Sequence, residues 1–166
     1  MYDLKVTTDF GITGIPTHIN CMKQCFFQLP TGNQILICCD GASKGNPGNV
    51  GVGFIDRNQQ GDCMGASTGG LGVTSNYIAE IMDVIIAGEW AVKKRFTEVC
   101  FCLDSSAVLK SFINSNIPWI VRNRWNNLKK SICNITFKRS YREINFSVDK
   151  MAKNGVLLAR GDHTLL

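Results

Sequence analysis

The pattern of apolar and polar positions along the chain changes its period near residue 74. Before that point there are three runs that suit β-strands, residues 34–40, 50–57 and 62–70, with short turns rich in Gly, Asn and Pro between them. Two tight turns in succession predict an antiparallel meander. The first run has five apolar residues in a row, which is typical of a central strand buried on both faces. In the second run, Gly51 and Gly53 would let another backbone approach closely.

After residue 74 the spacing of the apolar residues becomes helical. They recur every three or four positions from Ile78 to Trp90, which predicts a helix that Thr74 or Ser75 can cap and that extends to about Lys94. The order βββαβααβα then indicates an α/β fold in which the meander continues into βα units that add parallel strands to one edge of the sheet. The pattern predicts further strands at 98–104 and 135–141 and further helices at 105–113, 118–131 and 145–154.

The organisation expected along the chain is a single domain with a short segment on each side. Residues 1–33 show no clear period, and we interpret them as a leader or linker with one short strand around 25–29. Residues 34–156 form the predicted domain, and residues 157–166 form a C-terminal tail. A chain of 166 residues is long enough for one adequate core.

Composition excludes several classes of protein. No apolar run approaches the roughly 20 residues of a membrane span, and residues 1–15 carry charges and lack the apolar centre of a signal peptide. We therefore expect an intracellular protein, nuclear or cytoplasmic, that is monomeric and has no membrane partner. The eight cysteines are then expected to be reduced and mostly buried.

The net charge of +5 is unevenly distributed. Residues 121–153 hold nine Lys or Arg against two acids, so this span carries +7 and the remainder of the chain is slightly acidic. Such asymmetry favours a polyanion as partner. A solvated basic face is the alternative that charge alone leaves open.

Four carboxylates occupy similar positions at the ends of predicted elements. Asp40 and Asp104 each follow an apolar strand, and the two strands are expected to be parallel neighbours. Glu80 and Asp149 each lie one turn into a predicted helix that can face the same edge of the sheet. Clustered carboxylates at ~4 Å repel one another by several kcal/mol, so the cluster requires cations. Oxygen ligands suit Mg²⁺ or Mn²⁺, and two such ions would activate a water and stabilise a leaving oxygen.

Four motifs, DGASKGNPG, SNYIAE, LDSS and REINFSVD, occur in this order between residues 35 and 154. In order and spacing they resemble the ribonuclease H fold, and most of all the ribonuclease H-like domains of plant non-LTR retroelement reverse transcriptases. The resemblance implies a mixed sheet of three antiparallel and two parallel strands flanked by helices. It also implies an endonuclease that cleaves the RNA strand of RNA–DNA hybrids with two Mg²⁺ ions, which Mn²⁺ can replace, and leaves 5′-phosphate and 3′-hydroxyl ends.

The same resemblance assigns roles to the acids. Asp40 would bridge both metals, Glu80 and Asp104 would hold one of them, and Asp149 would hold the other. The partners implied are an RNA–DNA hybrid and an upstream reverse transcriptase domain.

Members of the family grip the hybrid across its minor groove and read RNA 2′-hydroxyls with backbone groups and an amide. The backbone of Gly41, Ala42 and Ser43 fits the first role, and Asn76 fits the second. Asn76 could equally cap the predicted helix. Lys44 is a candidate phosphate contact, although a turn lysine can also be simply solvated.

Basic residues near the last helices are further candidates for phosphate contacts. One pair falls where some members of the family carry a basic, Trp-containing handle, and here Trp125 and Leu128 are expected to pack in the core. A second pair lies just before the last helix, for which Asn145 is the expected N-cap. The four candidates are Arg122 and Arg124 in the handle and Arg139 and Arg142 before the helix.

The chain also departs from the family pattern. Many cellular members carry a histidine in the loop before the last helix, but the only histidines here are His18 and His163, and His163 lies in the predicted tail. Asp83 replaces a small apolar residue and is either an extra charge near the site or an exposed residue. Two other functions therefore remain open: an inactive module that binds hybrid or double-stranded RNA, and an interaction domain whose acids are surface charges.

Overall fold

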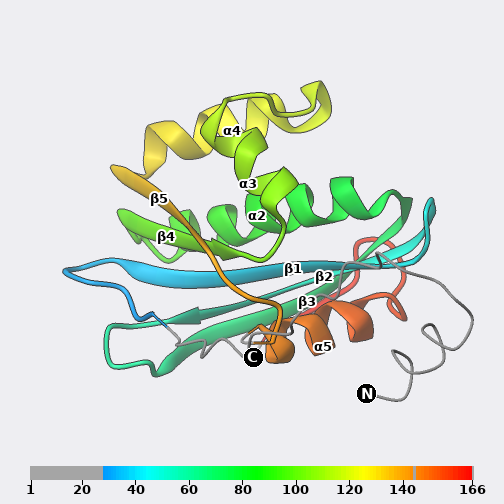
Figure 1. Cartoon of the computed structure of the whole chain (residues 1–166), viewed down its shortest axis with the longest axis horizontal. Helices are drawn as coiled ribbons and strands as arrows, with labels where there is room; N and C mark the ends of the chain where they lie inside the picture. Colours follow the sequence, from blue (N-terminus) through cyan, green and yellow to red (C-terminus); the bar gives the residue numbers. More distant parts are fainter. Residues whose placement is uncertain (1–27, 144, 166) are drawn as a thin grey trace, which may run out of the picture.

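The computed structural model describes residues 28–143 and 145–165 and contains one six-stranded sheet with helices on both faces (Figure 1). The strands are arranged in the order β5-β4-β1-β2-β3-β6. Their bounds are β1 Ile35–Gly45, β2 Gly48–Arg57, β3 Cys63–Thr74, β4 Glu98–Leu103, β5 Asn134–Arg139 and β6 His163–Leu165.

The strand pairing confirms the predicted mixed sheet. Strands β1, β2 and β3 form an antiparallel meander, and β4 and β5 add to the other side of β1 as parallel strands. The predicted strand around residues 25–29 lies largely outside the described residues. The segment expected to be a tail differs from the prediction, because β6 pairs antiparallel with β3 and becomes the sixth strand.

Among the described residues, three helices cover one face of the sheet and one helix covers the other (Figure 1). The helix α2 begins as predicted, because the amide of Ile78 donates a 3.3 Å hydrogen bond to the hydroxyl of the N-cap residue Ser75. The shorter α3 begins in the same way at Ser105. On one face lie α2 Asn76–Lys93, α3 Ser106–Ile113 and α4 Trp119–Ser131, and on the other lies α5 Phe146–Gly155.

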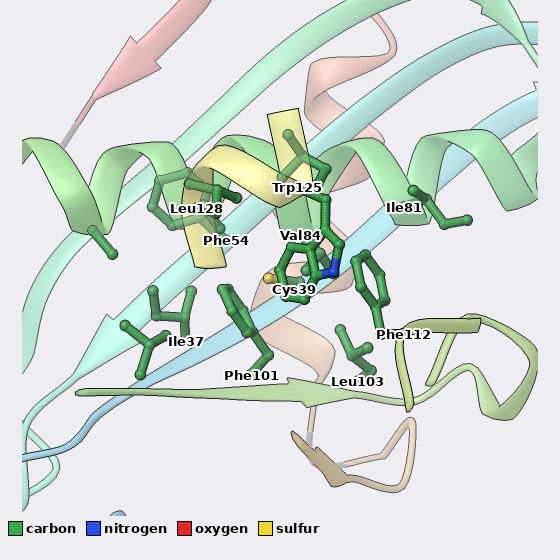
Figure 2. Close-up of a cluster of buried hydrophobic side chains, with 14 of the residues drawn as sticks. Ile37, Cys39, Phe54, Ile81, Val84, Phe101, Leu103, Phe112, Trp125 and Leu128 are labelled. Carbon is green, nitrogen blue, oxygen red and sulfur yellow. The ribbon is translucent and has the colours of Figure 1, made fainter. Parts of the chain in front are cut away.

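The larger core fills the space between the sheet and the three helices (Figure 2). Phe101 of β4 is fully buried and stacks on Phe137 of β5 with ring centroids 5.6 Å apart. The ring of Phe112 meets that of Trp125 edge-on at 4.8 Å. Trp125 and Leu128 are buried, which confirms that this face of α4 belongs to the core.

The opposite face carries α5, which lies almost against the backbone of β2. A Cβ atom on Gly51 would come within 2.2 Å of the carbonyl oxygen of Ala152, and one on Gly53 within 2.8 Å of the amide nitrogen of Ala152. The predicted close approach of another backbone at these two glycines is therefore confirmed. It fixes how near α5 and its side chains come to the sheet.

The first strand is longer than predicted. It continues through the expected turn to Gly45, because the residues after Asp40 keep pairing with β2, and the last pair is Gly45 with Gly48. Its parallel pairing with β4 ends earlier, at Cys38 and Cys102. Asp40 therefore lies inside β1, at the point where the neighbouring strand stops.

Two general findings agree with the composition. The six cysteines in the described part of the chain are free, and the four that belong to strands β1 and β4 are buried. Within residues 28–143 and 145–165, no helix has both the length and the apolar character that a membrane span requires.

Candidate active site

The edge of the sheet where β4 ends brings two of the predicted carboxylates together. Asp40 and Asp104 each lie two residues beyond Cys38 and Cys102, the last pair in the parallel ladder. Asp40 is buried, with 5% of its surface exposed, while Asp104 is half-buried. The two carboxylates thus follow parallel neighbours at the same end of the sheet, as the sequence predicts.

Helix α2 carries Glu80 against the same part of β1. A Cβ atom on Gly41 would lie 2.7 Å from the backbone nitrogen of Glu80, so the strand and the first turns of the helix are in direct contact. Asn76 donates a 2.8 Å hydrogen bond from Nδ2 to Oε1 of Glu80, and Ser75 takes the capping role. The other oxygen, Oε2, is buried and has no hydrogen-bond partner among the described residues.

Helix α5 supplies Asp149 from the opposite face of the sheet. Its carboxylate is held by two cations, with Nζ of Lys153 at 2.5 Å from Oδ2 and Nη2 of Arg142 at 3.5 Å from Oδ1. The side chain of Asp149 is 18% exposed. This acid therefore keeps limited access to solvent, and its charge is already balanced in part by two cations of the chain.

Electrostatics links the four acids. The pKa of Asp40 is raised to about 7, first by burial and then by the charges of Asp104, Asp149 and Glu80 in that order, while Arg142 opposes the rise. Burial also raises the pKa of Glu80, and Asp104 adds to that effect. Conversely, Asp149 and then Asp40 raise the pKa of the Arg142 guanidinium. Since these effects fall off with distance, the four carboxylates lie in one electrostatic neighbourhood.

The residues fit divalent metal ions in kind but are not arranged as a ready-made metal site. Carboxylate oxygens are the ligands that Mg²⁺ and Mn²⁺ prefer, and the buried Oε2 of Glu80 accepts no hydrogen bond among the described residues. In the described part of the chain, however, no group of three or more His, Cys, Asp or Glu side chains is placed so that it could hold a metal ion.

A groove of about 650 Å³ has one of these acids, Asp149, in its lining, together with residues of β1, α2 and α5 and of the loop before α5. It brings together six of the predicted substrate residues with Asp149 and Lys153. The six are Gly41, Ala42, Ser43, Lys44, Asn76 and Arg142.

The other three predicted substrate residues do not line this groove. Arg124 forms two 2.7 Å hydrogen bonds with the carboxylate of Glu89 on α2, and this partner raises its pKa. Arg122 donates to the carbonyl oxygen of Ile117 at 3.2 Å. Arg139 is exposed at the end of β5.

Three residues near the site make contacts that the sequence analysis did not name. Asp83, for which exposure was one alternative, is completely buried, and its Oδ2 accepts a 2.8 Å hydrogen bond from the amide of Asp40. Asn145 stands at the N-cap position of α5 but makes no capping hydrogen bond, and its amide donates instead to the carbonyl of Cys39. Lys153 could have been found, since it lies four residues after Asp149 on one helix face.

His163 does not take the place of the missing loop histidine. In the register of the sheet, Gly41 pairs with Val52, Val52 with Gly69, and Gly69 with His163. His163 is therefore three strands away from Gly41, about 14 Å at the usual strand spacing.

Comparison with known proteins places this arrangement among related chains. The family described as reverse transcriptase-like matches residues 38–155. A protein named ribonuclease H from Geotalea uraniireducens (strain Rf4) is 38% identical over 97 residues, which make up 58% of this chain and 63% of that protein. The match thus covers less than two thirds of the length of this relative.

Solved structures show the same fold. RNase H1 from the halophilic archaeon Halobacterium salinarum NRC-1 matches with a TM-score of 0.69 at 24% identity, over 74% of this chain and 97% of that one. LC11-RNase H1, crystallised in complex with an RNA/DNA hybrid, matches with a TM-score of 0.66 at 23% identity, over 74% and 96% of the two chains. These similarities confirm the predicted fold class, an α/β ribonuclease H-like fold.

Proposed function

The chain belongs to the reverse transcriptase-like family, and on this basis we propose that it is an endonuclease that hydrolyses the RNA strand of RNA–DNA hybrids. The observation that carries the proposal is that acids gather where the β1–β4 ladder ends: Asp40 and Asp104 each follow it by two residues, and Glu80 lies on the helical turn that contacts Gly41. The named relative from Geotalea and the hybrid seen in the LC11 complex support the choice of activity and substrate.

The residues that would hold two Mg²⁺ or Mn²⁺ ions are Asp40, Glu80, Asp104 and Asp149, with Asp40 between the two positions. Ions bound there would supply an activated water and a charge to stabilise the leaving oxygen, so that the products carry 5′-phosphate and 3′-hydroxyl ends. The backbone of 41–43 and the amide of Asn76 would contact the RNA, and Lys44 and Arg142 would hold phosphates along the groove. Arg122, Arg124 and Arg139 lie outside the groove lining and would contribute only if the hybrid extends beyond it.

The finer assignments rest on the sequence motifs. The four motifs support an origin in a plant non-LTR retroelement, in which residues 1–33 would connect the domain to an upstream reverse transcriptase. Sequencing the locus from which the chain comes tests this origin, because it predicts reverse transcriptase coding sequence upstream.

The test of the activity is cleavage of an end-labelled hybrid with Mg²⁺. We expect the RNA strand to be cut to 5′-phosphate products, chelation to stop the reaction, and Asp40→Asn to abolish it while Asp62→Asn leaves it unchanged. Asp62 is a suitable control because it is exposed and lies in the turn between β2 and β3. Binding of hybrid or double-stranded RNA without Mg²⁺-dependent cleavage would instead identify an inactive binding module.

A further inference from the structure

One peptide group next to the site is held by side chains from both faces of the sheet. The peptide joins Cys39 to Asp40. Its carbonyl oxygen accepts a 3.2 Å hydrogen bond from Nδ2 of Asn145, and its N–H donates a 2.8 Å hydrogen bond to Oδ2 of Asp83. Both hydrogen bonds are buried. Asp83 lies on α2 and Asn145 is the N-cap residue of α5. Side chains from helices on opposite faces of the sheet therefore bind the same peptide group (Figure 1).

This peptide lies where one of the two strands next to β1 ends. The parallel ladder between β1 and β4 ends at Cys38 and Cys102, immediately before it. Backbone polar groups that are buried need partners, and here two side chains supply them. On its other side β1 still pairs with β2, with Asp40 opposite Gly53. Asp83 and Asn145 therefore add to that pairing at the point where the support of β4 ends.

The two holders are also close in sequence to predicted metal ligands. Asp83 follows Glu80 by three residues on α2, and Asn145 precedes Asp149 by four residues at the start of α5. A residue three positions along a helix lies on the same face, one turn away. The hydrogen bond of Asp83 therefore ties the helical turn that carries Glu80 to the backbone of Asp40.

Packing alone does not explain an aspartate at position 83, because burying a carboxyl group destabilises the fold. It is completely buried, and its Oδ1 has no hydrogen-bond partner among the described residues. The other buried positions of α2 hold apolar or small residues, from Ala79 to Ala91. A small apolar residue would fill the position without the cost of burying a carboxyl group.

We propose that Asp83 is a positioning residue that fixes the distance between Asp40 and Glu80 through its hydrogen bond to the Asp40 amide, and so sets the affinity of the site for divalent metal. The inference rests on the proposed function, because it assumes that Asp40 and Glu80 bind metal. It assigns no chemical step to Asp83, which reaches the site only through the Asp40 backbone. Residues that orient ligands in this way typically alter metal affinity or activity by 10- to 100-fold.

The test uses two variants at the position and one matched control. Asp83→Ala removes the acceptor, Asp83→Asn keeps a carbonyl oxygen of the same shape, and Ile85→Ala opens a comparable space two residues further along α2 without touching the site. Ile85 is completely buried in the core. If Asp83→Ala does not fold, Asp83→Val, which fills more of the space and also lacks an acceptor, replaces it.

Two measurements separate positioning from packing. The first is the Mg²⁺ concentration for half-maximal cleavage, and the second is the shift in Tm that Mg²⁺ produces in the absence of substrate. We expect Asp83→Ala to need about tenfold more Mg²⁺ in both measurements and Asp83→Asn to restore the wild-type response. Ile85→Ala should lower the Tm without changing either Mg²⁺ dependence.

Several results would overturn the proposal: an unchanged Mg²⁺ dependence in Asp83→Ala, an equal change in Ile85→Ala, or no recovery in Asp83→Asn. The Tm measurement also keeps this proposal apart from the proposed function. If the wild-type chain cleaves no hybrid, the nuclease assignment fails, while the Tm shifts of the variants still decide the role of Asp83. A wild-type Tm that does not respond to Mg²⁺ would overturn the positioning role itself.

Discussion

The ammonium group of Lys153 lies 2.5 Å from Oδ2 of Asp149, one turn earlier on the same helix. Arg142 lies 3.5 Å from the other oxygen, so both oxygens of this acid face a cation of the chain. A metal ion that uses Asp149 must share it with these groups or displace them. In the proposed metal site, the affinity for metal would therefore depend on residues that are not themselves ligands.

Replacing Lys153 by Ala should lower the Mg²⁺ concentration for half-maximal cleavage by about twofold. The lysine side chain is 63% exposed, and ion pairs of this i,i+4 kind contribute about 0.4 kcal/mol, which corresponds to a factor of about two. A titration of cleavage rate against Mg²⁺ measures the change. Lys150→Ala, an exposed lysine on the same helix, should have no effect. A higher Mg²⁺ requirement in Lys153→Ala would mean that Lys153 supports the substrate rather than competing with the metal.

Asp56 of β2 should make stability depend on pH. It is completely buried, both of its carboxyl oxygens lack hydrogen-bond partners among the described residues, and burial raises its pKa to about 7. Between about pH 4 and pH 7 the folded chain keeps a proton that the unfolded chain releases, so the free energy of unfolding falls as the pH rises through this window. The raised pKa of Asp40 acts in the same direction. Asp56→Asn should therefore reduce the loss between about pH 5 and pH 8 by on the order of 2 kcal/mol.

Urea denaturation at several pH values, without divalent metal, measures this slope. Asp62→Asn should keep the wild-type slope, because Asp62 is exposed. An Asp56→Asn protein with the same pH dependence as the wild type would show that Asp56 is already ionised in the fold at low pH.

An added methyl group at Gly41 should push β1 and α2 apart. The Cβ atom of Gly41→Ala would lie 2.7 Å from the amide nitrogen of Glu80 and 2.9 Å from the carbonyl carbon of Ala79, and both are backbone atoms that cannot rotate away. We expect a loss of about 1–3 kcal/mol in stability and a smaller Tm shift with Mg²⁺. Gly69→Ala is the control, since its nearest atom would be 3.4 Å away. Equal stability of the two variants would show that α2 can move aside freely.

The Arg124–Glu89 pair should contribute to the packing of α4 on α2 and not to substrate binding. Both side chains are partly exposed, at 37% and 43%, so a double-mutant cycle with Arg124→Ala and Glu89→Ala should give a coupling of about 0.5–1 kcal/mol that decreases in high salt. Urea denaturation measures the cycle. Hybrid affinity should be the same in Arg124→Ala and in Glu89→Ala. A loss of affinity in Arg124→Ala alone would restore Arg124 as a phosphate contact.

Much of the fold follows from local patterns. The helical spacing after Ser75 and its hydroxyl cap were sufficient to predict α2, and five strands were found near their observed positions. The length of β1 could not be predicted, because Gly41 to Gly45 have the composition of a turn. Their extended structure comes from pairing with β2, in which Ser43 faces Val50 and Lys44 faces Asn49.

The sequence predicted the positions of site residues only where the direction of the strands determines them. Asp40 and Asp104 follow parallel strands, so their common edge could be expected from the order of the elements. The burial of Asp83 could not be predicted, because the sequence does not show whether this position of the helix packs against the sheet or lies at its edge. The partner of Arg124 lies on another helix, 35 residues away, and no local pattern indicates it.

The short strand β6 pairs with Ser67, Thr68 and Gly69 and lies along the outer side of β3. A recombinant protein cut after Val156, the boundary that the motifs favour, would lose this cover. The uncovered backbone of β3 would then be an open template on which a strand of another molecule can assemble. Such a product is expected to self-associate as its concentration rises. A protein that runs through Leu165 keeps β6 paired with β3, so this part of β3 is not available to another molecule.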